Sequence, residues 1–320
     1  MSYKKLLLVF GILFVVTAFA MDVTQEVTVE VLPSANITIT IHSPTDGTYD
    51  ARRLQFNITT SEEAEKIEFI NYNDKNPRWK RLCRNCDEYG FTRKKMKSLN
   101  EGKNNVTIRA TMAETGEIVE ESFFVITDSR DPRITKTEPR RGLSNGHFLA
   151  EFREVNPTSL FITYGNLTIQ RSEEVNLSAC VEERRKTVCE FFVNLTDFEN
   201  EEIEYWLNLT DIIGNEDISR IREVEVDTTP PLINNWTASL PDGRRVTFTF
   251  NVIELNFDNI EYIDYEDRNP RWRTLCSRLK DGICEKRKTF RRGDHTLDIT
   301  AFDDAGNEKI IVEGLEFEIL

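Results

Sequence analysis

The sequence of 320 residues has only three histidines, His42, His147 and His295, and none stands beside a motif typical of a catalytic nucleophile. It also lacks a glycine-rich phosphate loop and a zinc-binding helix motif. Acidic neighbours such as Glu182 and Glu183 would point to opposite faces of a strand, so they could not act together as acid and base. The sequence therefore predicts that the protein is not an enzyme and has no catalytic residue.

Long apolar runs are also missing, apart from one near the start. Lys4 and Lys5 precede an apolar run from Leu6 to Phe19, which ends at small residues. This run is shorter than the roughly 18 to 20 residues that cross a bilayer. The pattern is typical of a secretory signal peptide, residues 1–20, with an uncleaved anchor as the alternative; residues 21–34 form a lead segment. We expect a secreted protein, extracellular or at the cell surface, with no transmembrane helix in the mature chain.

After the leader, no stretch has the period of an amphipathic helix. Apolar and polar residues instead alternate over short runs, as they do in strands with one buried face. The sequence therefore predicts an all-β fold. At equivalent places in the chain, three triplets are expected to face inward: Val106, Ile108 and Ala110; Tyr205, Leu207 and Leu209; and Leu297, Ile299 and Ala301.

One phrase occurs twice, as Asp74–Cys83 and again as Asp267–Cys276, at an offset of 193 residues. This offset is about twice the length of an immunoglobulin-sized sandwich, so a third copy is expected between the two. A diverged one is present, because the segment Val125–Ile134 is echoed by Val224–Ile233 at an offset of 99 residues. We therefore predict three tandem immunoglobulin-like β-sandwich domains after the signal peptide, at residues 35–127, 128–227 and 228–320.

The second and third copies share an order of elements. A strand leads to a turn of the form Asp-x-x-Gly-Asn, at Asp211–Asn215 and Asp303–Asn307, and in the second copy another strand then leads to Asp-Thr-Thr-Pro-Pro at 227–231. This order resembles the immunoglobulin-like repeats of bacterial and archaeal cell-surface proteins, over essentially all of Asn36–Leu320. The resemblance implies a β-sandwich used as an adhesin, spacer or envelope component. Its expected partner is a cell-surface protein or glycan.

The six cysteines fall two to a predicted domain. Export would place them in an oxidising compartment, where disulfides form. Six cysteines allow fifteen pairings, but closure within each separately folding domain favours local bonds. The spacing of the first pair also fits a redox site or half a zinc site, although its context is a basic hairpin. We expect disulfides between Cys83 and Cys86, Cys180 and Cys189, and Cys276 and Cys284.

The two copies of the repeated phrase carry basic residues in a chain whose net charge is −14. An acidic exterior argues against binding to nucleic acid. Two interpretations of the phrase remain. Each tryptophan could stack on a sugar while the cations hold a carboxylated or sulfated polymer, or the tryptophan could pack in the core with the cations solvated or paired to acidic residues just before, such as Asp267. The second is favoured. The candidate binding residues are Arg78, Trp79, Lys80, Arg81, Arg271, Trp272 and Arg273.

Oxygen-bearing side chains gather at the predicted joints between domains, where loops of the following sandwich meet the linker. Hard oxygen ligands of this kind suit Ca²⁺, and a bound ion would stiffen a joint. Turn chemistry alone also explains Asp and Asn in hairpins. Apart from this structural calcium, no cofactor is expected. The candidate ligands are Asp128, Glu154, Asn156 and Asp211 at the first joint and Asp227, Glu254, Asn256, Asp303 and Asp304 at the second.

The chain contains many Asn-x-Ser/Thr sequons, which could carry N-linked glycans in an exported protein. The alternative is that Asn and Thr are abundant on exposed strands and at strand ends. The candidate sites are Asn36, Asn57, Asn105, Asn166, Asn176, Asn194, Asn208 and Asn235.

Overall fold

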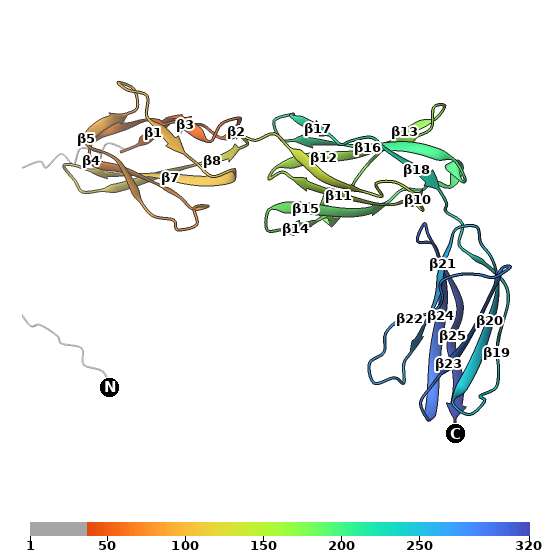
Figure 1. Cartoon of the computed structure of the whole chain (residues 1–320). Helices are drawn as coiled ribbons and strands as arrows, with labels where there is room; N and C mark the ends of the chain where they lie inside the picture. Colours follow the sequence, from red (N-terminus) through yellow and green to blue (C-terminus); the bar gives the residue numbers. More distant parts are fainter. Residues whose placement is uncertain (1–36) are drawn as a thin grey trace, which may run out of the picture. The chain divides into compact units, whose positions relative to one another are not determined.

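The computed structural model describes residues 37–320, so the predicted signal peptide, the lead segment and the sequon at Asn36 lie outside the described residues. The described part consists of strands and turns with two short 3-10 helices, η1 (Leu177–Ala179) and η2 (Thr196–Phe198). This confirms the predicted all-β fold, and the sheets form tandem β-sandwiches (Figure 1). Within this range, no helix has the length and apolar character that crossing a membrane requires.

Module 1 is the sandwich made by the first eight strands. Its larger sheet has the order β1–β4–β7–β8–β2, with β5 also paired to β4, and β3 and β6 form a small second sheet. The long strand β4 pairs with β1 at its start and with β7 at its end. The strands are β1 (Ile39–Ser43), β2 (Gly47–Tyr49), β3 (Arg53–Gln55), β4 (Asn57–Asn71), β5 (Lys80–Tyr89), β6 (Met96–Ser98), β7 (Gly102–Met112) and β8 (Ile118–Thr127).

Module 2 has two well-formed sheets. One has the order β10–β18–β16–β12–β13, with β17 also on β16, and the other has the order β14–β15–β11–β9. Strand β10 runs parallel to β18, while the other pairs are antiparallel. This is the layout of an immunoglobulin-like sandwich. The strands are β9 (Arg133–Glu138), β10 (Leu143–Ser144), β11 (His147–Arg153), β12 (Pro157–Gly165), β13 (Gln170–Glu174), β14 (Val181–Glu183), β15 (Lys186–Phe192), β16 (Glu202–Asp211), β17 (Glu216–Ile218) and β18 (Arg222–Val226).

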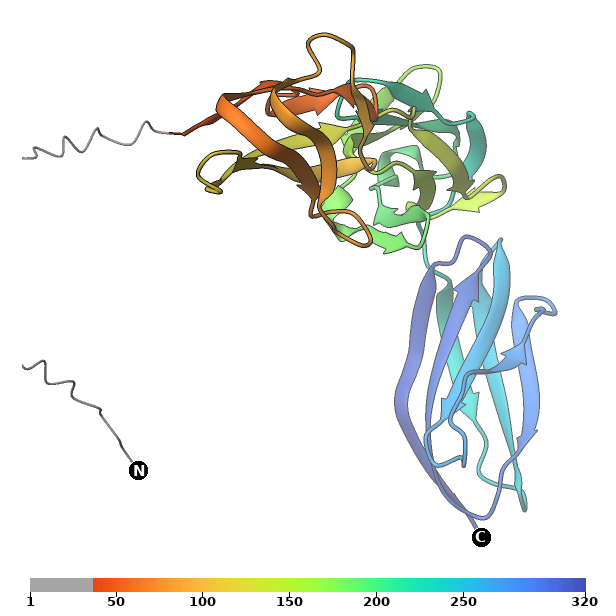
Figure 2. The same cartoon turned by 90° about the vertical axis from the view of Figure 1, so that its left-hand side faces the viewer.

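Module 3 pairs a sheet of order β19–β20–β23 with a sheet of order β22–β21–β24–β25. Its strands run along the length of the module, as Figure 2 shows for the blue part of the chain. Phe248 and Phe250 from the first sheet and Ile299 from the second meet in one core cluster. The strands are β19 (Leu232–Ala238), β20 (Arg245–Ile253), β21 (Phe257–Asp264), β22 (Arg273–Cys276), β23 (Ile283–Thr289), β24 (Gly293–Asp303) and β25 (Glu308–Ile319).

The alternation of apolar and polar residues along the strands correctly predicts which side chains lie in the core. All nine residues of the three predicted inward triplets are at most 1% exposed, on β7, β16 and β24. Because successive side chains of a strand point to opposite faces, the residues between them face outward or to the edge. Alternation in the sequence also predicts opening strands at Asn36–Ile41 and Val246–Val252. The first described strand of module 1 starts at Ile39, and Val246–Val252 lies within β20.

Each strand pairing among the described residues joins two strands of the same module. Each module therefore makes its backbone hydrogen bonds within itself, as a separately folded sandwich does. The predicted domain limits at residues 128 and 228 fall between β8 and β9 and between β18 and β19. The limits themselves stay a prediction.

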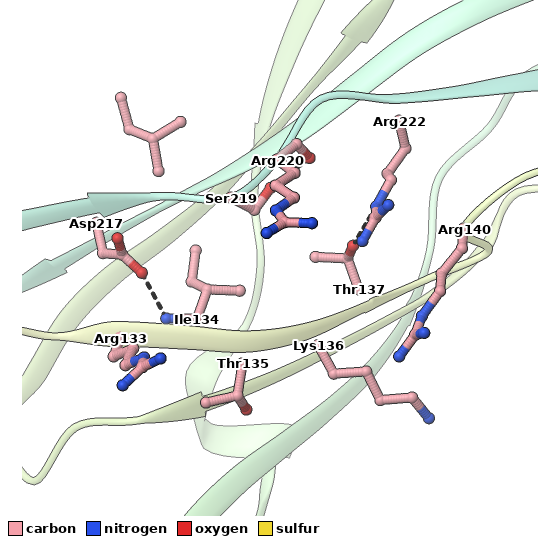
Figure 3. Close-up of a pocket in the computed structure, with 11 residues that line it drawn as sticks. Arg133, Ile134, Thr135, Lys136, Thr137, Arg140, Asp217, Ser219, Arg220 and Arg222 are labelled. Carbon is pink, nitrogen blue, oxygen red and sulfur yellow. Dashed lines mark hydrogen bonds between the residues drawn. The ribbon is translucent and has the colours of Figure 1, made fainter.

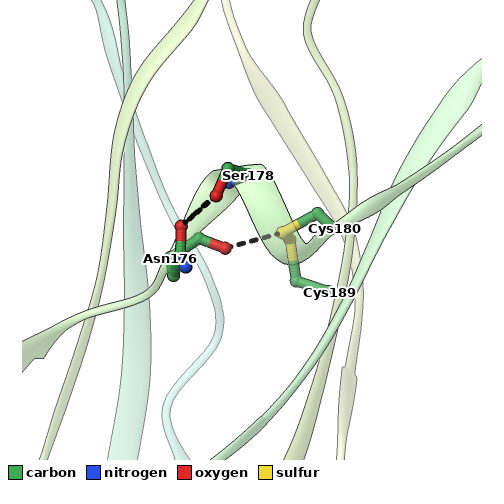
Figure 4. The surroundings of a disulfide bond; sticks show 4 residues. All are labelled: Asn176, Ser178, Cys180 and Cys189. Atoms are coloured by element: carbon green, nitrogen blue, oxygen red, sulfur yellow. Dashed lines mark hydrogen bonds between the residues drawn. A yellow bond between two sulfur atoms is a disulfide. The ribbon is translucent and has the colours of Figure 1, made fainter.

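The six cysteines form three local disulfides, with the predicted partners. Their Cα–Cα distances are 6.3 Å for Cys83–Cys86, 4.4 Å for Cys180–Cys189 and 6.1 Å for Cys276–Cys284. Figure 4 shows the second bond, which joins the residue after η1 to strand β15. No free cysteine remains in the described residues, so a cysteine nucleophile, a redox dithiol or a zinc-thiolate site would need one of these bonds to open.

Removing the middle disulfide is expected to lower the free energy of unfolding by about 2–3 kcal/mol, because the bond closes a loop whose ends are nine residues apart. The variant is Cys180→Ser with Cys189→Ala, which leaves no polar group at the buried position of Cys189. Urea unfolding of the variant and the parent measures the change. A difference under about 0.5 kcal/mol would show that the loop is held by its packing alone.

Candidate functional sites

The repeated phrase forms a turn closed by an ion pair. In module 1 the carboxylate of Asp74 lies 2.8 Å from the ammonium of Lys80. In module 3 Asp267 pairs with Arg273, again six residues later. The acidic residue at the start of each phrase therefore holds the strand that follows the turn, β5 or β22. Pairing between the phrase's cations and the preceding acids was one of the two interpretations of the sequence.

A buried polar pair lies under each turn, at equivalent positions. In module 1 the side-chain amide of Asn71 donates to Asn104 at 2.7 Å, and both are 1% exposed. In module 3 the equivalent residues are Asp264 and His295, 2.8 Å apart and 5% exposed. The other ring nitrogen of His295 lies 3.0 Å from the carbonyl oxygen of Arg291. Both ring nitrogens thus have an oxygen partner within the module.

Neither tryptophan of the repeated phrase lies in a core, and the favoured interpretation was wrong on this point. Trp272 is 45% exposed. Trp79 is half-buried, and the guanidinium carbon of Arg109 lies 3.9 Å from its ring centre. Arg109 also lies 2.8 Å from Glu68. The core interpretation failed because the turn carries each tryptophan past the end of the inward strand. The cations Arg78, Arg81 and Arg271 are exposed.

The pKa of Glu68 reflects this arrangement. Burial raises the pKa of its carboxyl, but hydrogen bonds and charge from Arg109 and Lys66 outweigh burial, and the net shift is downward. Glu68 is therefore a charged partner that holds Arg109 over Trp79. That ring face is already occupied, so of the two repeated turns only the one in module 3 offers a free tryptophan face.

A basic groove in module 2 was not predicted from the sequence. It has a volume of about 510 Å³ and lies between β9, the β17–β18 segment and the chain after β9. Figure 3 shows five cations around it. Two hydrogen bonds cross between its sides: Asp217 accepts from the backbone of Ile134, and Arg222 donates to Thr137. The cations are Arg133, Lys136, Arg140, Arg220 and Arg222.

The groove is notable because the segment from Asp128 to Asp227 has a net charge of −9. Within the described residues, Lys136 pairs with Glu138 at 3.0 Å, whereas no carboxylate forms an ion pair with Arg133, Arg140 or Arg220. Unpaired guanidinium groups around a concave surface suit anionic groups with several oxygens, such as carboxylate or sulfate. Sequence reasoning missed the groove because its two sides are about eighty residues apart in the chain, and only the fold brings them together.

The first joint brings together three of its predicted metal ligands. Strand β8 ends at Thr127, and the side chain of Asp128 that follows is fully buried. One carboxylate oxygen from each of Asp128, Glu154 and Asp211 lies within 4.8 Å of the others. The fourth predicted ligand, Asn156, has a buried amide nitrogen with no hydrogen-bond partner.

Local turns hold two of these carboxylates in place. Glu154 accepts hydrogen bonds from the next two backbone N–H groups, at 2.6 and 2.7 Å. Asp211 accepts the backbone N–H of Asn215 at 2.8 Å and its side-chain amide at 3.0 Å. Gly214 has φ +90°, the left-handed conformation for which the predicted turn needs glycine. The Asp-x-x-Gly-Asn turn therefore fixes the position of Asp211.

The second joint has the same residue types in a different hydrogen-bonding state. The side-chain amide of Asn256 donates to Asp227 at 2.9 Å, and that of Asn307 donates to the Asp227 carbonyl at 2.8 Å. Asn307 also donates to Asp303. Oxygens of Asp227 and Asp303 thus accept hydrogen bonds from asparagine amides of the protein.

The two remaining predicted ligands of the second joint play smaller parts. Glu254 accepts the backbone N–H of Asn256 at 2.8 Å, as Glu154 does with Asn156. The side chain of Asp304 is exposed, and its backbone N–H donates to the Asn256 carbonyl.

Burial raises the pKa of several carboxyls at the joints. It is the largest cause for Asp128 and Glu154 at the first joint and for Asp303 at the second. Neighbouring carboxylates add to the rise in each case, with Asp211 acting on both groups of the first joint. A raised carboxyl pKa marks a place where negative charge is poorly compensated.

The sequon asparagines differ in exposure. Asn176, Asn194 and Asn235 are exposed, while Asn57, Asn105, Asn166 and Asn208 are half-buried. The side-chain oxygen of Asn176 accepts from the backbone and hydroxyl of Ser178, next to the middle disulfide (Figure 4). Asn194 makes the same two contacts with Thr196. Glycosylation of these sites stays a prediction.

No family model matches the chain, and no curated protein matches it. Solved structures that are similar include the FN1–FN3 domains of chicken CNTN1, with TM-score 0.46 and 10% identity over 87% of this chain and 98% of that chain. Others are a tetra-tandem repeat in the extending region of a large adhesion protein, with TM-score 0.38 and 12% identity over 88% and 74%, and the titin I-band fragment I67–I69, with TM-score 0.30 and 13% identity over 87% and 98%. At these identities the similarity concerns the fold, and it supports no conclusion about activity or partner.

Proposed function

We propose that the chain is a non-enzymatic repeat protein of the cell exterior that serves as an adhesin, spacer or envelope component, like the prokaryotic surface repeats that its sequence resembles. The mechanism is mechanical. Each sandwich is a separately hydrogen-bonded unit, and a row of such units holds a surface at a distance from the point of attachment.

The observation that carries this proposal is that all six cysteines form local disulfides, one in each sandwich. Such bonds persist in oxidising compartments and are rare in the cytosol. The three histidines also fall in three different modules, and the only one paired to a carboxylate, His295, is buried with Asp264. The cysteines and His295 are thus engaged in structure.

Labelling of intact cells of the native host tests the location. We expect a membrane-impermeant amine reagent to label the chain before lysis, and thiol alkylation followed by mass spectrometry to find all six cysteines protected. The proposal would be overturned by labelling only after lysis together with free thiols.

A second candidate function is binding of a carboxylated or sulfated polymer. Two observations support it: Trp272 presents a largely free ring beside Arg271 and Arg273, and the groove of module 2 has unpaired arginines. A polymer that contacted both sites at once would bind more tightly than it binds to either site alone.

Replacing Trp272 by alanine separates the two functions. Because the ring is 45% exposed, the free energy of unfolding should change by less than about 0.5 kcal/mol. If the polymer candidate is right, the variant should elute from immobilised dextran sulfate at lower salt than the parent. The matched control is Trp236→Ala, since Trp236 is half-buried and packs against the core, with its ring stacked on Phe250. It should lower stability and leave elution unchanged. Equal elution of the parent, Trp272→Ala and an Arg133→Ser/Arg220→Ser variant would eliminate this candidate.

A further inference from the structure

Asp128 is the most unusual carboxylate among the described residues. Its side chain is fully buried, and neither of its carboxylate oxygens has a hydrogen-bond partner. Burying a carboxylate without compensation is among the costliest arrangements in a protein, so a native structure normally supplies a hydrogen-bond donor, a cation or a metal ion. No cation of the described residues pairs with Asp128, and its two neighbouring donors, the Asn156 amide and the Arg130 backbone, form no hydrogen bond of normal geometry with its oxygens. The arrangement therefore points to a ligand.

The surroundings of Asp128 add negative charge. One oxygen each from Glu154 and Asp211 lies within 4.8 Å of the nearest Asp128 oxygen. No lysine, arginine or histidine of the described residues forms an ion pair with any of the three. Glu101 is a further acidic side chain whose charge acts on Asp128. Three carboxylates this close stay ionised together only where a cation compensates their charge.

The donor set identifies the ion. The three converging side chains offer only carboxylate oxygens, with neither histidine nitrogen nor cysteine sulfur. Such hard ligands suit Ca²⁺, Mg²⁺ or Mn²⁺ rather than zinc or copper. Calcium binds oxygens at about 2.3–2.6 Å, so oxygens on opposite sides of the ion lie about 4.6–5.2 Å apart, whereas those around magnesium lie about 4.0–4.2 Å apart. The oxygens lie within 4.8 Å of one another, which both spheres allow. Three protein carboxylates favour calcium, because magnesium usually binds only one or two carboxylates and keeps several waters.

The second joint serves as an internal comparison. Asp227 stands where Asp128 stands in the preceding repeat, and Asn256 stands where Asn156 stands. The Asn256 amide donates to the Asp227 carboxylate at 2.9 Å, while the Asn156 amide nitrogen has no partner. The same residue types therefore produce one joint closed by amides and one with an unpaired buried carboxylate.

We infer that the first joint is a calcium site with Asp128, Glu154 and Asp211 as ligands, and that the second joint holds no ion. The ion would join the residue that follows β8 to the loop after β11 and to the last residue of β16, both in module 2. It would tie the linker to module 2, and the inference does not depend on the proposed function. It narrows the sequence-based prediction of calcium from two joints to one.

Calorimetric titration of the full chain with CaCl₂, after treatment with a chelator, tests the site. We expect one ion per chain, much weaker binding of MgCl₂, and a melting temperature raised by about 10 °C when free calcium exceeds its dissociation constant a hundredfold. No heat and no melting shift would overturn the site. Two ions per chain would overturn its restriction to the first joint, and equal affinity for magnesium would overturn its assignment to calcium.

Asp128→Asn gives a signature that a general loss of stability cannot imitate. The variant removes the unpaired buried charge, so in chelator it should melt at a higher temperature than the parent, while its response to calcium should vanish. Asp227→Asn is the matched control at the second joint and should keep the calcium response. A calcium response that survives in Asp128→Asn, or that disappears in Asp227→Asn, would contradict the assignment.

Discussion

Phe152→Ala is expected to lower the free energy of unfolding of module 2 by about 3–5 kcal/mol and to leave modules 1 and 3 unchanged. Phe152 lies on β11, is fully buried and belongs to the core cluster of module 2. Removing its ring leaves a cavity that the surrounding strands can only partly fill. For a module of this size, the loss corresponds to a fall of about 12 °C or more in one melting transition.

The matched control for this prediction is Phe161→Ala. Phe161 lies on β12 of the same module but is 37% exposed on the outer face, so its removal should change stability by about 1 kcal/mol or less. Denaturant titration followed by hydrogen-exchange mass spectrometry assigns each change to a module. If Phe152→Ala weakened all three modules together, the sandwiches would not be independent.

Asp264→Ala is expected to destabilise module 3 by about 2–3 kcal/mol, the cost of leaving a buried polar group without its hydrogen-bond partner. The substitution leaves His295 only 5% exposed, with one ring nitrogen facing no acceptor. Chemical unfolding measures the loss. Asp242→Ala is the control, because the ion pair of Asp242 with Arg287 lies on the surface and should contribute less than about 1 kcal/mol.

Module 1 suggests a second test of the same pair. Asn71 and Asn104 occupy the equivalent positions without a charge. The double variant Asp264→Asn/His295→Asn places the same two asparagines in module 3. Because they can hydrogen-bond to each other, this variant should be more stable than Asp264→Ala, although asparagine fills less space than the histidine it replaces. If Asp264→Ala cost less than about 1 kcal/mol, or if the double variant were the weaker of the two, the pair would not stabilise the turn as described.

The sequence predicted those features of the fold that depend on local pattern. Alternation located the inward residues Val106, Leu207 and Ile299, because a period of two is imposed by the strand itself. The disulfide partners followed from separation along the chain, since short loops close most readily. The bounds of the first strand were less well predicted, because strand ends depend on pairing with distant strands.

The sites depended on contacts that the sequence does not encode locally. Trp272 lies beside an inward strand in the sequence, but the turn that follows Asp267 carries it to the surface. The groove of module 2 unites Arg133 and Arg220 from distant strands. The same residue types occur at both joints, and only the structure distinguishes the unpaired Asp128 from the amide-bound Asp227.

Hydrogen exchange of the full chain in rising denaturant tests most directly whether the protein is three independent sandwiches. We predict three groups of peptides, bounded near residues 128 and 228, each losing protection at its own denaturant concentration and with its own isotope envelope. Loss of protection throughout residues 38–320 in one cooperative step would contradict the account.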